Sequence, residues 1–202
     1  VRAGQTVLVH GANGGVGSVL VQLARAAGAR VIGTASARHH AALREQGVTP
    51  IDYRTENIPA RVRELAPHGV DAVFDHVGGR GITDSWSLLA PGGTLVSYGS
   101  ASTRDAEGSK QWPVLKLLAR VWLWNTLPNR RHAYFYNVWA GRALNRDRFR
   151  ARLRHDLTEV FEALRRGEIT ARIAAELPLT QVAEAMRLAE SGTVAGKVVL
   201  HA

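Results

Sequence analysis

Short apolar segments and amphipathic segments alternate along the first hundred residues of this 202-residue chain. The apolar segments are rich in β-branched residues, as buried parallel strands are, and they lie at 5–10, 30–34, 51–53, 70–75 and 94–98. Between them, apolar residues recur at helical spacing and predict helices over 16–27, 38–46, 58–65 and 82–89. Repeated strand–helix–strand units with short connections predict an α/β fold, a doubly wound parallel sheet with helices on both faces.

The pattern changes after Gly99. Residues 100–111 are small and polar, which predicts a loop. Beyond this loop the sequence predicts helices over 114–124, 148–166 and 179–191, with strands at 134–139 and 196–201. We therefore expect residues 1–202 to form one α/β domain with an extension of helices and strands at its C-terminal end.

Composition narrows the class of protein. With 46% hydrophobic and 21% charged residues the chain is ordinary for a globular protein, which argues against wholesale disorder. It has no cysteine, which excludes a disulfide, a thiol nucleophile or cysteine-ligated zinc within the chain. No apolar run reaches the ~18 residues of a membrane span and no signal peptide is visible, so we expect a cytoplasmic setting. The start at Val1, in a turn-like segment, predicts a piece of a longer protein.

The chain is basic, with a formal charge of +9 from 26 basic and 17 acidic residues. Only Lys110, Lys116 and Lys197 are lysines, so the excess is arginine. An anionic partner such as nucleic acid would account for this charge. We favour a GC-rich genome, whose codons favour arginine, because the basic residues are spread along the chain and no nucleic-acid motif is present.

A glycine-rich loop, Gly11-Ala12-Asn13-Gly14-Gly15-Val16-Gly17, lies between the first predicted strand and the first predicted helix. In that context such a loop binds the pyrophosphate of a dinucleotide, because a Cβ would block the close approach of backbone and phosphate. The helix N-terminus adds unpaired N–H groups and the positive end of its dipole. Ala12 replaces the first glycine of the G-x-G-x-x-G pattern, and Gly14 and Gly17 supply the other two.

The residues after the second strand predict which dinucleotide binds. A site for NAD usually has Asp or Glu about 20 residues after the loop, where it holds the ribose 2′-OH. No Asp or Glu occurs from Ser18 to Arg44, and this stretch instead holds Thr34, Ser36, Arg38, His39 and His40. Hydroxyl groups and a guanidinium suit a 2′-phosphate, so we predict NADP(H). Arg38 could instead be a solvated residue at the helix start, with Arg44 and the two histidines sharing its role.

Several motifs, in this order, resemble the medium-chain dehydrogenase/reductase superfamily, and its quinone oxidoreductase-like (zinc-type alcohol dehydrogenase-like) branch in particular. They are Gly11–Gly17, Val21–Arg25, Gly33–Ser36, Ile51–Arg54, Asp75–Gly79 and Pro91–Gly93, and the closing Gly196–Leu200 is similar to the family's end. The resemblance covers nearly the whole chain and is strongest over residues 5–100. It implies a Rossmann cofactor-binding domain of a two-domain reductase, with a GroES-like catalytic barrel before Val1, and it implies a homodimer.

The resemblance also implies roles for individual residues. Gly15 and Val16 would lie at the pyrophosphate, Ser36 and Arg38 near the 2′-phosphate, and Tyr53 by the adenosine. Val77 would lie beside the dinucleotide, Gly99 and Ser100 along the nicotinamide, and the segment 134–136 would close over it. The predicted cofactor-binding residues are thus Asn13, Gly14, Gly15, Val16, Gly17, Thr34, Ser36, Arg38, Tyr53, Val77, Gly99, Ser100 and Phe135.

Other side chains leave alternatives open. His10 and His76 end predicted strands at the ligand edge and could donate a proton, although we favour hydrogen-bonded structural histidines. The pair His39–His40 lacks a metal-site pattern, so we predict no metal. Trp112, Trp122 and Trp124 could line a substrate cleft, but we favour a place in the core or at a dimer contact.

These features together predict an NADPH-dependent reductase of quinones or α,β-unsaturated carbonyl compounds. The cofactor would donate hydride, and no residue here must act as a general acid. A zinc-dependent alcohol dehydrogenase is one alternative, whose zinc ligands would lie upstream of Val1. A non-catalytic module that binds NADPH or nucleic acid is another, supported only by the charge. No membrane partner is expected.

Overall fold

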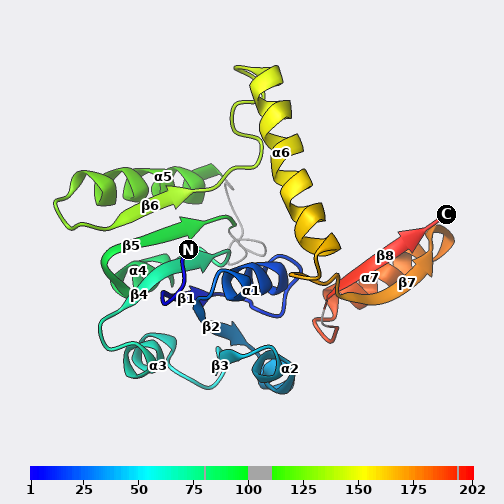
Figure 1. The fold of residues 1–202 in the computed structure, drawn as a ribbon, viewed down its shortest axis with the longest axis horizontal. Coiled ribbons are helices and arrows are strands. Elements are labelled where there is room, and N and C mark those ends of the chain that lie inside the picture. The colour runs from blue at the N-terminus through cyan, green and yellow to red at the C-terminus, as the bar shows by residue number, and fades with distance from the viewer. Residues whose placement is uncertain (80, 100–110, 195) are drawn as a thin grey trace.

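Six parallel strands form one sheet at the centre of the computed structural model, which describes residues 1–79, 81–99, 111–194 and 196–202 (Figure 1). The strand order is β3-β2-β1-β4-β5-β6. The strands are β1 (Thr6–Val9), β2 (Arg30–Ala35), β3 (Val48–Asp52), β4 (Val70–Asp75), β5 (Leu89–Ser97) and β6 (His132–Phe135). The chain winds outward from β1 to β3 and then returns to start β4 beside β1, so the order reverses between β1 and β4. This arrangement confirms the predicted doubly wound parallel sheet.

Side chains that alternate along the strands build two separate cores, one on each face of the sheet. Val7 and Val9 belong to the core under α1 (Gly17–Ala26) and α2 (His40–Glu45). Leu8, between them, belongs to the other core, where α3 (Ile58–Leu65), α4 (Gly81–Ser87) and α5 (Gln111–Thr126) contribute. Because successive side chains of a strand point to opposite faces, a fully apolar strand such as β1 must be covered on both sides.

Two strand boundaries differ from the prediction at the N-terminal side. β3 begins at Val48, because the buried Val48 pairs with Val31 although Thr49 and Pro50 interrupt the apolar run. β5 begins at Leu89 and continues through the Pro91–Gly93 segment, with an irregular register against β4. In both cases pairing with a neighbouring strand extends the strand beyond its apolar residues.

The strand predicted at 134–139 is shifted toward the N-terminus. β6 spans His132–Phe135, and Tyr136 contributes a last N–H bond to Ser97 O at 2.7 Å. Beyond it the Asn137 side chain accepts a hydrogen bond from Trp139 N at 2.9 Å, which forms a turn. The apolar and aromatic run therefore continues past the end of the strand.

The remaining elements lie outside the large sheet. α6 (Arg146–Arg165) begins at its cap Asn145, whose Oδ1 accepts the Arg148 N–H at 2.9 Å. β7 (Ile173–Pro178), which the sequence did not predict, pairs in parallel with β8 (Lys197–His201) in a second, two-stranded sheet. A short 3₁₀ turn (Leu179–Gln181) leads into α7 (Val182–Glu190) between them. Figure 1 shows α6 leading from the large sheet to this C-terminal unit, which we define as residues 168–202.

The free edge of the large sheet is partly covered by a side chain. β6 is an edge strand, and the side-chain amide of Asn125 pairs with Ala133 on its open side. Asn125 Nδ2 donates to Ala133 O at 2.8 Å, and Ala133 N donates to Asn125 Oδ1 at 2.9 Å. The amide thus satisfies the backbone groups that an edge strand would otherwise offer to another chain.

The aromatic residues of α5 differ in their surroundings. Trp124 stacks on Trp86 with ring centroids 4.7 Å apart and packs against the core, which confirms the structural interpretation for this residue. Trp122 is 69% exposed. The side chain of Trp112 lies outside the described part of the structure. None of the helices in the described ranges is long and apolar enough to cross a membrane.

Candidate functional site

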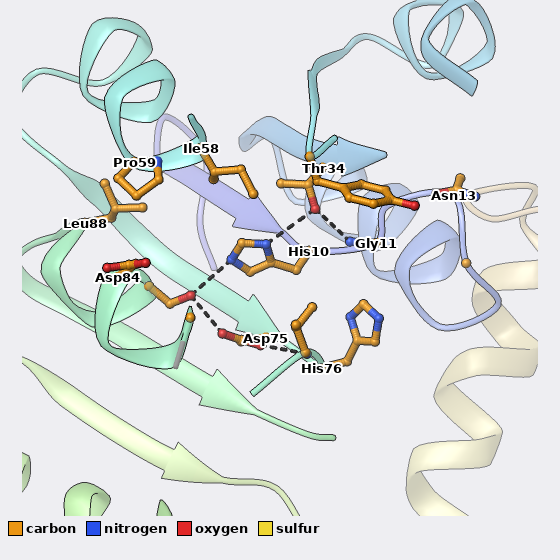
Figure 2. A pocket seen from close by; sticks show the side chains of 15 residues that line it. His10, Gly11, Asn13, Thr34, Ile58, Pro59, Asp75, His76, Asp84 and Leu88 are labelled. Atoms are coloured by element: carbon orange, nitrogen blue, oxygen red, sulfur yellow. Dashed lines mark hydrogen bonds between the residues drawn. The ribbon is translucent and has the colours of Figure 1, made fainter. Parts of the chain in front are cut away.

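A cavity of about 530 Å³ opens at the carboxyl ends of β1, β2 and β4, where the strand order reverses. Ligands of open α/β sheets bind at this place. Five predicted cofactor-binding residues line the cavity, namely Asn13, Gly14, Thr34, Tyr53 and Val77. They share it with residues that the prediction did not include, among them Ile58, Pro59, Asp75, Ser85 and Leu88. Figure 2 shows this cavity from close by.

The glycine-rich loop turns tightly between β1 and α1. Gly11 has a positive φ of 62°, and a Cβ on Gly17 would overlap the carbonyl of Gly11. Glycine is therefore required at position 17 by the contact between the start of the helix and the end of the strand. Ala12 is fully buried and fits because its partner on β2 is Gly33, where a Cβ would come within 2.6 Å of the Ala12 methyl group. Gly33 thus compensates for the missing first glycine of the pattern.

The N-terminus of α1 carries no side-chain cap. Its Val16 N-cap makes no side-chain hydrogen bond, and the first turn contains no acidic residue. Within the described residues, the backbone N–H groups of Gly15, Val16 and Gly17 have no hydrogen-bond acceptor. Unpaired N–H groups and the positive end of the helix dipole favour a bound anion at this point.

The end of β2 holds the residues predicted to face a 2′-phosphate. Ser36 is buried, and its Oγ accepts a hydrogen bond from Nε of the exposed Arg38 at 3.3 Å. The neighbouring strand brings in a carboxylate, since Asp52 pairs with Ala35 in the register of β2 and β3. Its Oδ1 accepts the Arg54 N–H at 3.0 Å, and this bond lowers the pKa of Asp52. The search for acidic residues between 18 and 44 could not find Asp52, because it lies on the next strand. Its carboxylate stabilises the turn after β3.

His39 and His40 are both buried. His40 Nε2 lies 3.2 Å from the carbonyl of Ala35. His39 is buried, and its Nε2 has no hydrogen-bond partner. Burial lowers the pKa of His39, and Arg38 lowers it further, while the backbone of Gly192 opposes the shift. The described residues contain no group of three His, Asp or Glu side chains that could hold a metal ion.

A chain of hydrogen bonds passes through His10 and connects the loop with β4 and α4 (Figure 2). Gly11 N donates to Thr34 Oγ1 at 3.0 Å, and that hydroxyl lies 3.4 Å from His10 Nδ1. On the other side, His10 Nε2 lies 3.1 Å from Ser85 Oγ.

The directions of these bonds follow from the last one. Ser85 Oγ donates its only proton to Asp75 Oδ2 at 2.8 Å, so it must accept the proton of His10 Nε2–H. Nδ1 of the neutral ring then accepts the proton of the Thr34 hydroxyl. Burial lowers the pKa of His10, which favours this neutral form, while Asp75 opposes and His76 supports the shift. His10 is therefore hydrogen-bonded through both ring nitrogens, as the structural interpretation from the sequence expects.

Asp75 also shapes the turn that carries Val77. Its Oδ1 accepts the N–H groups of Val77 at 2.8 Å and Gly78 at 2.9 Å. The ring of His76 stacks on Tyr98 at 5.9 Å, and Nδ1 of His76 is buried without a partner. Burial raises the pKa of Tyr98 to about 12, with a further contribution from Asp75. Tyr98 therefore keeps its hydroxyl proton at neutral pH.

The described residues predicted on the nicotinamide side are not among those that line this cavity. Phe135 ends β6 opposite Ser97, and Gly99 follows β5 with its Cα close to the backbone of His76. Ser100 lies outside the described residues. Gly15, Val16 and Gly17 form the outer part of the loop, where the side chain of Lys197 crosses Gly15. No local sequence signal points to Lys197, because it follows Gly15 by more than 180 residues.

A family described as zinc-binding dehydrogenase matches residues 47–200. The zebrafish (Danio rerio) synaptic vesicle membrane protein VAT-1 homolog is 34% identical over 206 residues, which cover 99% of this chain and 41% of the zebrafish protein.

Two solved structures share the fold across 100% of this chain. The mycobacterial protein Rv1454c, complexed with NADPH, is 30% identical with a TM-score of 0.73, and 58% of it is covered. The Escherichia coli quinone oxidoreductase, also complexed with NADPH, is 25% identical with a TM-score of 0.75 and the same 58% coverage. The chain spans about half the length of these relatives.

The family match covers most of the chain, and the alignments with the two solved structures cover all of it. The sequence relatives and the solved structures support the same branch that the sequence motifs indicate. This chain belongs to the zinc-binding dehydrogenase family, in the quinone oxidoreductase-like branch of the medium-chain dehydrogenase/reductase superfamily.

Proposed function

We propose that this chain binds NADP(H) in the cleft between β1 and β4 and is the cofactor-binding part of a reductase. The observation that carries the proposal is the uncapped N-terminus of α1, which faces the glycine loop with unpaired N–H groups. The cavity beside it is lined by apolar and polar side chains, as a nucleotide base and ribose require. The related structures with NADPH support the same assignment.

Each part of the cofactor has residues suited to hold it. The loop residues Asn13, Gly14, Gly15, Val16 and Gly17 would hold the pyrophosphate. Thr34, Ser36 and Arg38 would face the ribose and its 2′-phosphate, and Tyr53 and Val77 would enclose the adenosine. Gly99 and Phe135 would lie along the nicotinamide. When bound, the cofactor supplies a hydride for an electron-poor carbon.

The preference for the phosphorylated cofactor rests on charge at the end of β2. A guanidinium and a hydroxyl lie side by side in Arg38 and Ser36, and no acidic residue follows within the strand or the first turn after it. A 2′-phosphate gains charge-assisted hydrogen bonds from such groups. The carboxylate of Asp52 on the neighbouring strand accepts the Arg54 N–H through Oδ1 and so holds the turn after β3.

The proposed substrate class is a quinone or another α,β-unsaturated carbonyl compound. It is supported by the relation to the E. coli quinone oxidoreductase. Because this chain covers about half of its relatives, we further propose that a GroES-like catalytic domain precedes it in the intact protein. That domain would close the substrate side, and the residues described here would bind the cofactor, orient its ring and exclude water.

The family's description raises the question of zinc, and the described residues of this chain do not form a zinc site. The chain has no cysteine, and its described residues contain no cluster of three ligands. A zinc-dependent alcohol dehydrogenase would therefore need zinc ligands from beyond the described residues. No step of the proposed reaction depends on a metal held by this chain.

Titration of the purified chain with NADPH and with NADH, followed by calorimetry, tests the proposal. NADPH is expected to bind more tightly than NADH. Arg38→Ala is expected to weaken NADPH binding about 10-fold or more and to leave NADH binding nearly unchanged, because a charge-assisted hydrogen bond to phosphate is lost. Arg61→Ala is the matched control, since Arg61 pairs with Glu56 and Glu64 on the α3 side.

Two outcomes would contradict parts of the proposal. Equal affinities of the wild-type chain for NADPH and NADH would defeat the cofactor preference. Tight DNA binding that falls steeply with salt, together with no binding of either dinucleotide, would favour a nucleic-acid-binding module and defeat the reductase assignment altogether.

A further inference from the structure

The C-terminal unit reaches the glycine loop through one side chain. Lys197 is the first residue of β8, and its aliphatic stem and ammonium lie over the backbone of Gly15. A Cβ on Gly15 would overlap the Cε and Nζ atoms of Lys197. Residues more than 180 positions apart are thus in contact at the outer side of the loop, and the missing side chain of Gly15 makes room for the lysine.

Backbone contacts hold the start of β8 in this position. Lys197 N donates to Arg172 O at 2.8 Å, and Gly196 before it has a φ of 121° with Arg172 directly against its Cα. This turn needs glycine, because a Cβ there would overlap the Arg172 carbonyl. The direction in which Lys197 leaves the turn is therefore set by the backbone of the C-terminal unit.

A second contact ties the C-terminal unit to α1, which starts at the loop. Gln22 Oε1 accepts the Thr170 N–H at 2.7 Å, and Gln22 Nε2 donates to Thr170 O at 3.2 Å. The side-chain amide of Gln22 therefore pairs with both backbone groups of Thr170. Together with Lys197 over Gly15, it fixes the C-terminal unit against the glycine-rich loop and the middle of α1.

The glycine loop has no positive side chain of its own. From Ala12 to Ala24 the sequence contains no Lys or Arg, and the first basic residue of α1 is Arg25 in its last turn. The loop offers an anion only N–H groups and the helix dipole. Lys197 adds a full positive charge at this place, and among the ion pairs of the described residues none involves Lys197.

We propose that Lys197 is a ligand of the cofactor's pyrophosphate, delivered to the glycine loop by the C-terminal unit. The inference rests on the proposed binding of NADP(H). Lys197 is exposed, so its flexible stem can lift from Gly15 as a dinucleotide enters and return its ammonium to the phosphate oxygens. A residue of the last strand, β8, thereby becomes part of the pyrophosphate site at the loop that follows the first strand, β1.

The test compares NADPH with 2′-AMP, which carries the adenosine and the 2′-phosphate but no pyrophosphate. Lys197→Met keeps the apolar stem and removes the charge. It is expected to weaken NADPH binding about 10-fold, the effect of losing one charge-assisted hydrogen bond, and to leave 2′-AMP binding unchanged. Lys197→Arg is expected to restore most of the NADPH affinity. Calorimetric titrations of the purified chain measure both ligands.

Arg187→Met is the matched control, because Arg187 also lies in the C-terminal unit but pairs with Glu184 on the surface of α7. It should bind NADPH as the wild-type chain does. If the wild-type chain binds NADPH and Lys197→Met binds it equally well, the inference fails while the proposed function stands. Equal weakening of NADPH and 2′-AMP would also overturn it, since the lysine would then act through the fold. If the wild-type chain does not bind NADPH, the proposed function itself fails.

Discussion

His10 is a buried polar side chain whose two ring nitrogens serve different parts of the candidate site. Nδ1 accepts from Thr34 on the loop side, and Nε2 donates to Ser85, which in turn donates to Asp75. Asp75 then holds the turn of Val77 through its other oxygen. The histidine thus links the glycine loop and the Val77 turn, which are two walls of the same cavity. Buried polar groups of this kind are stable only when every partner is in place.

The position of His10 predicts how stability depends on pH. Burial holds its pKa below the ordinary value of 6.5, with Asp75 raising and His76 lowering it further. The unfolded chain therefore binds more protons as the pH falls through 6.5, and the free energy of unfolding decreases there. Above neutral pH this group makes no further change to stability. His10→Asn is expected to flatten this slope between about pH 7 and 5, and to cost about 1–3 kcal/mol at neutral pH through lost hydrogen bonds.

Urea unfolding of both proteins at several pH values checks this prediction. His68→Asn is the matched control, because His68 is exposed and takes no part in the hydrogen bonds of His10, so this variant should keep the wild-type stability at neutral pH. His39, whose pKa is also lowered, keeps part of the slope in the His10 variant. An unchanged slope in His10→Asn would mean that another group carries the acid sensitivity.

At the scale of elements, the edge strand β6 depends on Asn125 at the end of α5. Asn125→Leu would leave the N–H and C=O groups of Ala133 without their side-chain partners. The expected cost is about 1–3 kcal/mol for buried unsatisfied backbone groups, together with a greater tendency of the open edge to pair with another chain. Thermal melting and light scattering measure these two effects.

The neighbouring Thr126 provides the control for this experiment. Its hydroxyl donates to Leu123 O within α5 and does not contact β6. Thr126→Val should therefore melt and scatter light like the wild-type chain. If Asn125→Leu behaves like Thr126→Val, the amide does not protect the edge, and the predicted homodimer could use β6 without first displacing it.

The elements of the large sheet were largely predictable because their signals are local. β1 and β4 are short apolar runs, and α1 follows a glycine loop, so pattern and turn residues agree there. β7 was missed because its strand reads Ile-Ala-Ala-Glu-Leu-Pro and none of its residues is fully buried. A strand that pairs only with β8 has weak apolar alternation, so only tertiary contacts define it.

The candidate site was predictable where its residues belong to local sequence motifs or lie at the ends of predicted strands. Asn13 and Gly14 belong to a contiguous motif. Thr34 lies near the end of β2 and Val77 follows β4, and the carboxyl ends of these strands meet at one edge of the sheet. Ser85 and Lys197 could not be found in this way. Ser85 lies in the short helix α4 and donates a hydrogen bond to Asp75. Lys197 lies in the last strand of the chain and contacts Gly15. Their roles depend on distances between elements, which no local pattern encodes.

At the scale of the whole molecule, the first and last parts of the chain meet at the loop. The large sheet forms most of the cavity. The C-terminal unit places Lys197 over Gly15, and its Thr170 pairs with the side-chain amide of Gln22 in α1. α6 joins the two and otherwise stands apart from the sheet (Figure 1). The placement of Lys197 must therefore depend on the few contacts that hold the C-terminal unit against α1.

Gln22 is the residue that tests this dependence, because its amide pairs with Thr170 and its other hydrogen bond in the described residues is to Ser18 O within α1. Gln22→Ala is expected to weaken NADPH binding about 2- to 10-fold through loss of that pairing. In the Lys197→Met background the same change should have little effect, since residues that act through one another give non-additive effects. Gln46→Ala removes an amide that bonds only within α2 and should bind NADPH normally. Additive effects of the Gln22 and Lys197 changes would show that the C-terminal unit does not carry the lysine to the loop.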